Sequence, residues 1–129
     1  IYSAFVNNGS IYRPHLVEQG EQMWIQRVFS DKTVKTIKED LINVIADEKG
    51  TGHAIYRDNV ILAGKTGTAE IKQSQSDTTG TELGWFTVMT TDSKQPLLIT
   101  TMVEDVKGRG GSGYVVEHTK TPLDLYLSK

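Results

Sequence analysis

The alternation of apolar and polar positions predicts one well-defined helix in the first half of the chain. Apolar residues recur at intervals of three, four and seven between Val34 and Ile45, which is the spacing of one buried helix face. Ser30 precedes this stretch as an N-cap, and Gly50 follows it as a residue that can end a helix. The inward-facing positions of the predicted helix are Val34, Ile37, Leu41, Val44 and Ile45.

Three apolar runs in the second half predict β-strands, at 60–71, 83–91 and 97–106. A polar loop at 73–82 joins the first two, and a turn at 92–96 joins the last two. Links this short favour antiparallel pairing, because a parallel return needs a crossover of a dozen or more residues. The pattern therefore predicts an antiparallel sheet of about three main strands.

Shorter elements are expected at both ends of the chain. The opening residues are apolar, lack an initiator methionine and run into Asn7-Asn8-Gly9, so we expect the last turns of a helix that began upstream. Short extended segments are expected at 10–19 and 22–29. A C-terminal helix is predicted over 113–127, made irregular by Pro122. Its inward-facing candidates are Val115 or Val116, Leu123, and Tyr126 or Leu127.

Together these elements predict an α+β fold, with helices packed on one face of the antiparallel sheet. The run 97–106 is the most apolar of the three strands. We therefore expect it to be central in a larger parent fold and to need a neighbour that this chain does not contain. Left open, such an edge predicts either a homodimer of the chain or coverage by another segment.

Composition narrows the classes of function. The chain has 129 residues and 37% hydrophobic content, which fits one domain. Its formal charge of −2 leaves no basic face, so we expect no nucleic-acid partner. The absence of cysteine excludes disulfides and cysteine nucleophiles. No apolar stretch approaches the length of a membrane span. We expect no metal or cofactor, because the histidines are widely separated. These histidines are His15, His53 and His118.

Two glycine-containing motifs fit common nucleotide sites poorly. The run into Gly64-Lys65-Thr66 resembles a phosphate-binding loop, but that pattern requires glycine at position 59, which is Asn59. The stretch 108–113 matches the G-x-G-x-x-G spacing, yet the chain ends before a second parallel strand and its acidic residue could follow. A strand-to-helix turn is the better interpretation of 108–113.

The stretch Lys65-Thr66-Gly67-Thr68 is the main candidate for chemistry. Glycine inside a strand often marks the close approach of a ligand or another backbone. An edge strand with a lysine and two hydroxyls could pair with an extended peptide and bind its carboxylate. The spacing alone equally allows an exposed lysine near a β-bulge. Both interpretations stay open on this evidence.

Wider sequence features resemble the penicillin-binding transpeptidases and serine β-lactamases. "AGKTGTAE", followed after a polar loop by "GWFTVM", resembles their K-T-G region, the third motif after S-x-x-K and S-x-N. "IYSAFVNNGSIYRPHLV" resembles the segment between the second and third motifs, and the helix with "GTG" resembles the helix that follows. The resemblance covers nearly the whole chain. It is closest to class B penicillin-binding proteins of Gram-positive bacteria, including the low-affinity type associated with β-lactam resistance.

The resemblance implies a role for each residue of the motif. Lys65 would assist electrostatics and proton transfer around the nucleophile, and Thr66 would bind the carboxylate of a D-Ala-D-Ala terminus or of a β-lactam. Gly67 would leave room for the ligand. The main chain of Thr68 would pair with the ligand and supply one N–H of the oxyanion hole. The parent would be an extracytoplasmic, membrane-anchored enzyme that cross-links the peptidoglycan of the cell wall.

The chain departs from the family pattern at two motifs. No serine is followed by lysine three residues later or by asparagine two residues later. We therefore expect residues 1–129 to be the C-terminal portion of a transpeptidase domain, with the nucleophile in an upstream half, and to be inactive alone. A carboxypeptidase, a β-lactamase, a β-lactam sensor and a non-catalytic peptide-binding module remain alternatives.

Overall fold

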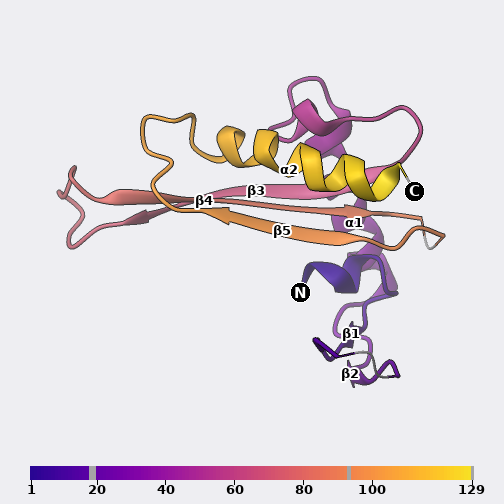
Figure 1. Cartoon of the computed structure of the whole chain (residues 1–129). Helices are drawn as coiled ribbons and strands as arrows, with labels where there is room; N and C mark the ends of the chain where they lie inside the picture. Colours follow the sequence, from indigo (N-terminus) through magenta and orange to yellow (C-terminus); the bar gives the residue numbers. More distant parts are fainter. Residues whose placement is uncertain (18–19, 93, 129) are drawn as a thin grey trace.

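The computed structural model describes residues 1–17, 20–92 and 94–128. Two short 3-10 helices, two α-helices and five strands make up this part of the chain (Figure 1). In chain order they are η1 (Tyr2–Phe5), β1 (Ile11–Tyr12), β2 (Met23–Ile25), α1 (Asp31–Ala46), η2 (His53–Ile55), β3 (Leu62–Ile71), β4 (Thr81–Thr90), β5 (Leu98–Val103) and α2 (Ser112–Leu127).

Helix α1 begins where the sequence predicts and ends earlier. The Ser30 hydroxyl accepts a hydrogen bond from the Thr33 N–H at 3.2 Å, which confirms the N-cap. The expected end at Gly50 is wrong, because Asp47 already has extended backbone angles. Gly50 instead closes the following turn, where its N–H donates to the Asp47 carbonyl at 2.8 Å.

The main sheet is antiparallel with strand order β3-β4-β5, as the short connections predict. Strand β4 is central, and β5 lies at an edge of the described sheet. The strand expected over 97–106 ends at Val103, because Asp105 has a φ of +56° and turns the chain away. Whether β5 is central in a larger fold stays a prediction, as does a homodimer through its edge.

The two faces of this sheet are covered differently, and the expectation that helices lie on one face is wrong for α1. Helix α2 covers one face (Figure 1), where Phe86 packs with residues of α2. Helix α1 lies along β3 and contributes to two clusters, since its apolar stripe is broad enough to reach both sides of an edge strand. Ile45 belongs to the cluster under α2, and Leu41 to a second cluster. The second cluster also contains Phe5, Ala63 and Met89.

Helix α2 runs without interruption from Ser112 to Leu127, with Pro122 inside it. Pro122 is exposed, so its ring is accommodated on the solvent side. Both Val115 and Val116 are buried, as is Leu123. The inward positions were therefore predicted correctly at these three residues.

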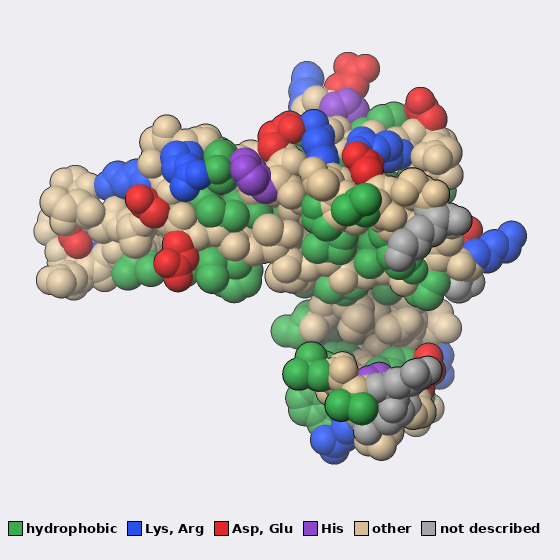
Figure 2. All heavy atoms as spheres, in the orientation of Figure 1, with side chains coloured by type: hydrophobic (Ala, Val, Ile, Leu, Met, Phe, Trp, Pro, Cys, Tyr) green, Lys and Arg blue, Asp and Glu red, His purple; other side chains and the backbone are tan. Residues whose placement is uncertain are grey.

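The N-terminal region forms a small lobe beside the sheet. Residues Tyr2–Phe5 are a 3-10 helix rather than α-helical turns, and Gly9 follows with a φ of +79°. Strands β1 and β2 pair antiparallel and project from the body, exposing apolar side chains (Figure 2). The expected segment 10–19 includes residues 18 and 19, and the expected turn at 92–96 includes residue 93; these three residues lie outside the described ranges.

Candidate active site

Strand β3 places the four residues of the K-T-G region on two sides of the sheet. Lys65 lies opposite Thr87 of β4, and Thr66 lies opposite Phe86. Because side chains alternate along a strand, Thr66 and Thr68 lie on the face covered by α2, and Lys65 lies on the other. Within the described part of the chain, β3 pairs only with β4, so the main-chain groups on its outer edge have no strand partner there.

The hydroxyl of Thr66 is held by a second hydroxyl. Thr66 is only 8% exposed, and its Oγ1 lies 2.8 Å from Oγ1 of Thr51. Thr51 lies in the tight turn after α1, where the Gly52 N–H donates to the Val44 carbonyl at 2.9 Å. If Thr51 donates in this pair, the Thr66 proton remains free for an anion. Sequence reasoning missed Thr51, and only the glycines around it signalled a constrained turn.

Lys65 lies at a shallow cavity on the open face. Its ammonium donates to the Thr66 carbonyl at 2.8 Å, which curls the side chain back along β3. The cavity has a volume of about 330 Å³ and includes Tyr2, Trp85 and Thr100 in its wall. The Lys65 ammonium is therefore exposed beside an open depression, where a further anionic or polar group can approach it.

Gly67 is not required by the packing of this chain. A Cβ built at Gly67 would lie 3.6 Å from the Trp85 Cβ, an ordinary van der Waals distance. The β3–β4 register continues without a shift from Leu62 to Ile71, so the β-bulge considered for this stretch is absent. The lack of a side chain at Gly67 leaves the outer surface of β3 bare.

Thr68 lies close to the segment that enters α2. A Cβ built at Gly111 would lie 3.7 Å from the Thr68 Oγ1, and Thr68 itself is exposed. Thr66 and Thr68 thus present two hydroxyls on one side of the same open strand edge. The structure brings Lys65, Thr66, Gly67 and Thr68 together along this edge with Thr51 behind them.

No group of three or more histidine, cysteine, aspartate or glutamate side chains within the described ranges could hold a metal ion. His53 instead pairs with the Ile45 carbonyl at 2.9 Å, and His118 with the Tyr114 carbonyl at 2.8 Å. None of the helices in the described ranges is both long and apolar enough to span a bilayer.

Comparison with known proteins decides which family this arrangement represents. The profile of the family described as "Penicillin binding protein transpeptidase domain" matches residues 1–121. The chain belongs to the penicillin-binding protein transpeptidase domain family. It is also 38% identical over 122 residues to penicillin-binding protein 3 of Bacillus subtilis (strain 168). That alignment covers 92% of this chain and 18% of the relative, so the chain spans less than a fifth of that protein's length.

Solved structures show the same fold. A putative peptidoglycan glycosyltransferase from Atopobium parvulum matches with a TM-score of 0.71 and 20% identity, covering 96% of this chain and 31% of that one. The transpeptidase domain of Burkholderia pseudomallei penicillin-binding protein 3 matches with a TM-score of 0.68 and 19% identity, covering 96% and 40% respectively. The α+β arrangement of this penicillin-binding protein transpeptidase sequence is therefore the fold of its family.

Proposed function

We propose that this chain forms the β3 wall of a serine-type D,D-transpeptidase site. The observation that carries the proposal is the K-T-G stretch on an open strand edge of a penicillin-binding protein transpeptidase domain. Lys65, Thr66 and Thr68 supply a cation and two hydroxyls along that edge, and Gly67 leaves room for a ligand between them. Such an edge suits an extended peptide, which pairs through its main chain.

The substrate would be the D-Ala-D-Ala end of a peptidoglycan stem peptide, and β-lactams would occupy the same place. Its terminal carboxylate would accept hydrogen bonds from the Thr66 and Thr68 hydroxyls. The Lys65 ammonium, on the other face of β3, would assist the electrostatics and proton transfer around the nucleophile. Thr51 supports this role as the donor in the 2.8 Å pair, since the Thr66 proton is then available to the carboxylate. Hydrogen bonds to an ionised acceptor are stronger than neutral ones.

The reaction would be a two-step acyl transfer. A serine hydroxyl attacks the carbonyl of the penultimate D-Ala and loses its proton to a neighbouring base. The base then gives this proton to the nitrogen of the terminal D-Ala, which leaves as an amine when the peptide bond breaks. The amine of a second stem peptide then attacks the acyl-enzyme and releases the serine. The Thr68 N–H would stabilise the negative oxygen formed in each step. Residues outside 1–129 would supply the serine, since no serine here is followed by lysine at the S-x-x-K spacing.

The whole protein would be extracytoplasmic and anchored to the membrane by a segment outside residues 1–129. The resemblance of its K-T-G region to class B penicillin-binding proteins supports a Gram-positive, low-affinity type, which is associated with β-lactam resistance. Residues 1–129 would then be the C-terminal portion of the catalytic domain and would pack against its upstream half. On its own this portion would give no covalent penicillin adduct by intact mass spectrometry.

The test uses the longer protein that contains these residues and a fluorescent penicillin. Thr66→Val and Thr68→Val each remove a carboxylate-binding hydroxyl, so the second-order acylation rate should fall about tenfold or more, by the cost of a charged hydrogen bond. Lys65→Ala should lower it further. Thr36→Val, which removes an exposed hydroxyl from α1, is the matched control. Equal acylation of all four variants would refute the proposed wall.

A further inference from the structure

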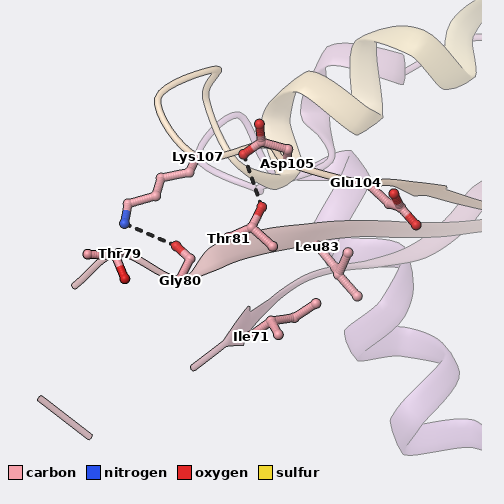
Figure 3. Close-up of a pocket in the computed structure, with 8 residues that line it drawn as sticks. All are labelled: Ile71, Thr79, Gly80, Thr81, Leu83, Glu104, Asp105 and Lys107. Atoms are coloured by element: carbon pink, nitrogen blue, oxygen red, sulfur yellow. Dashed lines mark hydrogen bonds between the residues drawn. The ribbon is translucent and has the colours of Figure 1, made fainter. Parts of the chain in front are cut away.

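The segment that joins β5 to α2, residues 104–111, lies against the β3–β4 hairpin where its loop joins β4, residues 78–81, called the hairpin base below (Figure 3). Val106 is fully buried, and its N–H donates to the Glu82 carbonyl at 2.9 Å. This segment, called the joining segment below, therefore continues the contact with β4 beyond the end of β5. An open pocket of about 570 Å³ lies between the joining segment and the hairpin base, with Ile71 and Leu83 in its wall.

Two polar side chains of the joining segment hold the hairpin base. The Lys107 ammonium donates to the carbonyls of Thr78 and Gly80, the latter at 3.1 Å. The Asp105 carboxylate accepts a hydrogen bond from the Thr81 hydroxyl at 3.0 Å. Figure 3 shows the Lys107–Gly80 and Thr81–Asp105 contacts, both at the start of β4. A lysine suits this place because its ammonium has three donors and can serve two carbonyls at once.

The hairpin needs such support because its outer part has only two strands. The last pair between β4 and β5 is Gly84 with Val103, whereas β3 and β4 continue to the pair Ile71 with Thr81. An isolated two-stranded hairpin is at best marginally stable in water. The part of β3 from Thr68 to Ile71 therefore depends on contacts other than a third strand.

The joining segment also reaches the candidate site itself. Its last residue, Gly111, lies beside the Thr68 hydroxyl, at the 3.7 Å distance given above for a built Cβ. The Gly111 N–H donates to the Val106 carbonyl at 3.3 Å, which ties this end to the buried middle of the segment. One short segment thus contacts both the hairpin base and Thr68.

We propose that Lys107 is a positioning residue for the peptide-binding edge of β3. By holding the hairpin base to the joining segment, it fixes the twist of β3 from Thr68 to Ile71, where an extended peptide bound at Thr66 and Thr68 would continue. Lys107 contacts no substrate in this scheme and acts through the Thr78 and Gly80 carbonyls. The inference rests on the proposed function for its effect on acylation, and on this structure alone for its effect on the hairpin.

The first test measures amide hydrogen exchange by NMR in the 129-residue chain, without any ligand. Lys107→Met keeps the length of the side chain and removes its donors, so amides at 69–71 and 81–83 should exchange at least tenfold faster. Lys107→Arg keeps a cation with several donors and should stay within threefold of the wild type. Lys35→Met, at an exposed position on α1, is the matched control. Exchange of Lys107→Met within threefold of the wild type would overturn the proposal.

A second variant distinguishes local loosening of the hairpin from a general loss of folding. Thr81→Val removes the contact with Asp105 and leaves Lys107 in place, so the same amides should exchange faster by a smaller factor. Amides of the central strand at 86–89 should be unchanged in both variants. Equal acceleration across β4 would indicate global destabilisation and would also overturn a positioning role.

The third test measures acylation of the longer protein by fluorescent penicillin. Lys107→Met should lower the second-order rate about tenfold, and Lys107→Arg should restore most of it. Unchanged acylation in Lys107→Met would overturn the positioning role even if the hairpin exchanged faster. A wild-type protein that penicillin does not acylate would instead refute the proposed function, and the exchange result on this chain would still decide whether Lys107 holds the hairpin.

Discussion

The two faces of the β3-β4-β5 sheet differ in how completely the rest of the described chain covers them. The face under α2 is closed by the chain's own residues: Phe86 and Val88 are fully buried there, in one cluster with side chains of α2. On the opposite face Ala63 and Met89 are buried in the second cluster, but Trp85 remains 40% exposed and Met102 42% exposed. Thr66 therefore lies on a face that the described chain covers, whereas Lys65 lies on the part of the opposite face that it leaves exposed.

The largest loss of stability should come from removing a large buried side chain from the face under α2. Phe86→Ala removes a fully buried ring and should lower the free energy of unfolding by about 3–5 kcal/mol. Trp85→Ala, its neighbour on the open face, should cost about 1 kcal/mol, in the range of ordinary substitutions. Urea denaturation of the 129-residue chain followed by circular dichroism measures both. Equal losses would show that the two faces are equally packed.

Adding a methyl group to a glycine on each face tests the same difference in packing between the two faces. A Cβ at Gly84 would lie 2.5 Å from the Val115 Cγ2 and 2.9 Å from a Val106 methyl, so Gly84→Ala should destabilise by about 1–3 kcal/mol through overpacking. A Cβ at Gly67 meets only the ordinary contact with Trp85, and Gly67→Ala should stay within about 0.5 kcal/mol. The melting temperatures of the two variants, compared with the wild type, provide the measurement.

A pair of threonine hydroxyls lies on each face. Removing one hydroxyl from either pair should change the free energy of unfolding less than the substitutions above. Thr51→Val leaves the buried Thr66 hydroxyl without its partner and should cost about 1 kcal/mol. Thr100→Val breaks a similar pair with Thr87, at 3.0 Å, and Thr87 is as buried as Thr66, so a similar cost of about 1 kcal/mol is expected. A cost near zero for either variant in chemical denaturation would show that water reaches the hydroxyl left behind.

Strong acid should weaken the tip of the β3–β4 hairpin, the turn at residues 73–79, through one carboxylate. The Thr79 hydroxyl and N–H, and the Gln73 N–H, lower the pKa of Asp77 from its ordinary 3.8 to about 2. A lowered folded pKa means that this carboxylate stabilises the tip above pH 3.8 and loses that effect as the pH falls through about 2. NMR titration should place the Asp77 midpoint near 2, together with the shift change of the Thr79 amide. A midpoint near 3.8 would contradict the tip structure.

Periodicity predicted much of the fold. The i, i+3, i+4 spacing from Val34 to Ile45 located α1, and three apolar runs located β3, β4 and β5 with their antiparallel order. The site residues Lys65, Thr66, Gly67 and Thr68 came from family resemblance, since alternation alone could not distinguish an anion-binding edge from an exposed turn.

Other features depend on contacts between residues that are far apart in the sequence. The pattern of apolar and polar positions does not show which distant residues meet. Thr51 meets Thr66 because the turn after α1 folds back onto β3, and the two residues are 15 positions apart. Lys107 reaches Gly80 across 27 positions, which depends on where β5 ends and on the positive φ of Asp105. The spread of α1 over two clusters likewise depends on its position along an edge strand.

A crystal structure of the longer protein acylated by a β-lactam tests the central claim most directly. The proposed wall predicts the ligand carboxylate within hydrogen-bonding distance of the Thr66 and Thr68 hydroxyls, with the Thr68 N–H directed at the acyl oxygen and the Thr51–Thr66 contact kept. A covalent adduct whose carboxylate binds elsewhere, with the outer edge of β3 unoccupied, would contradict it.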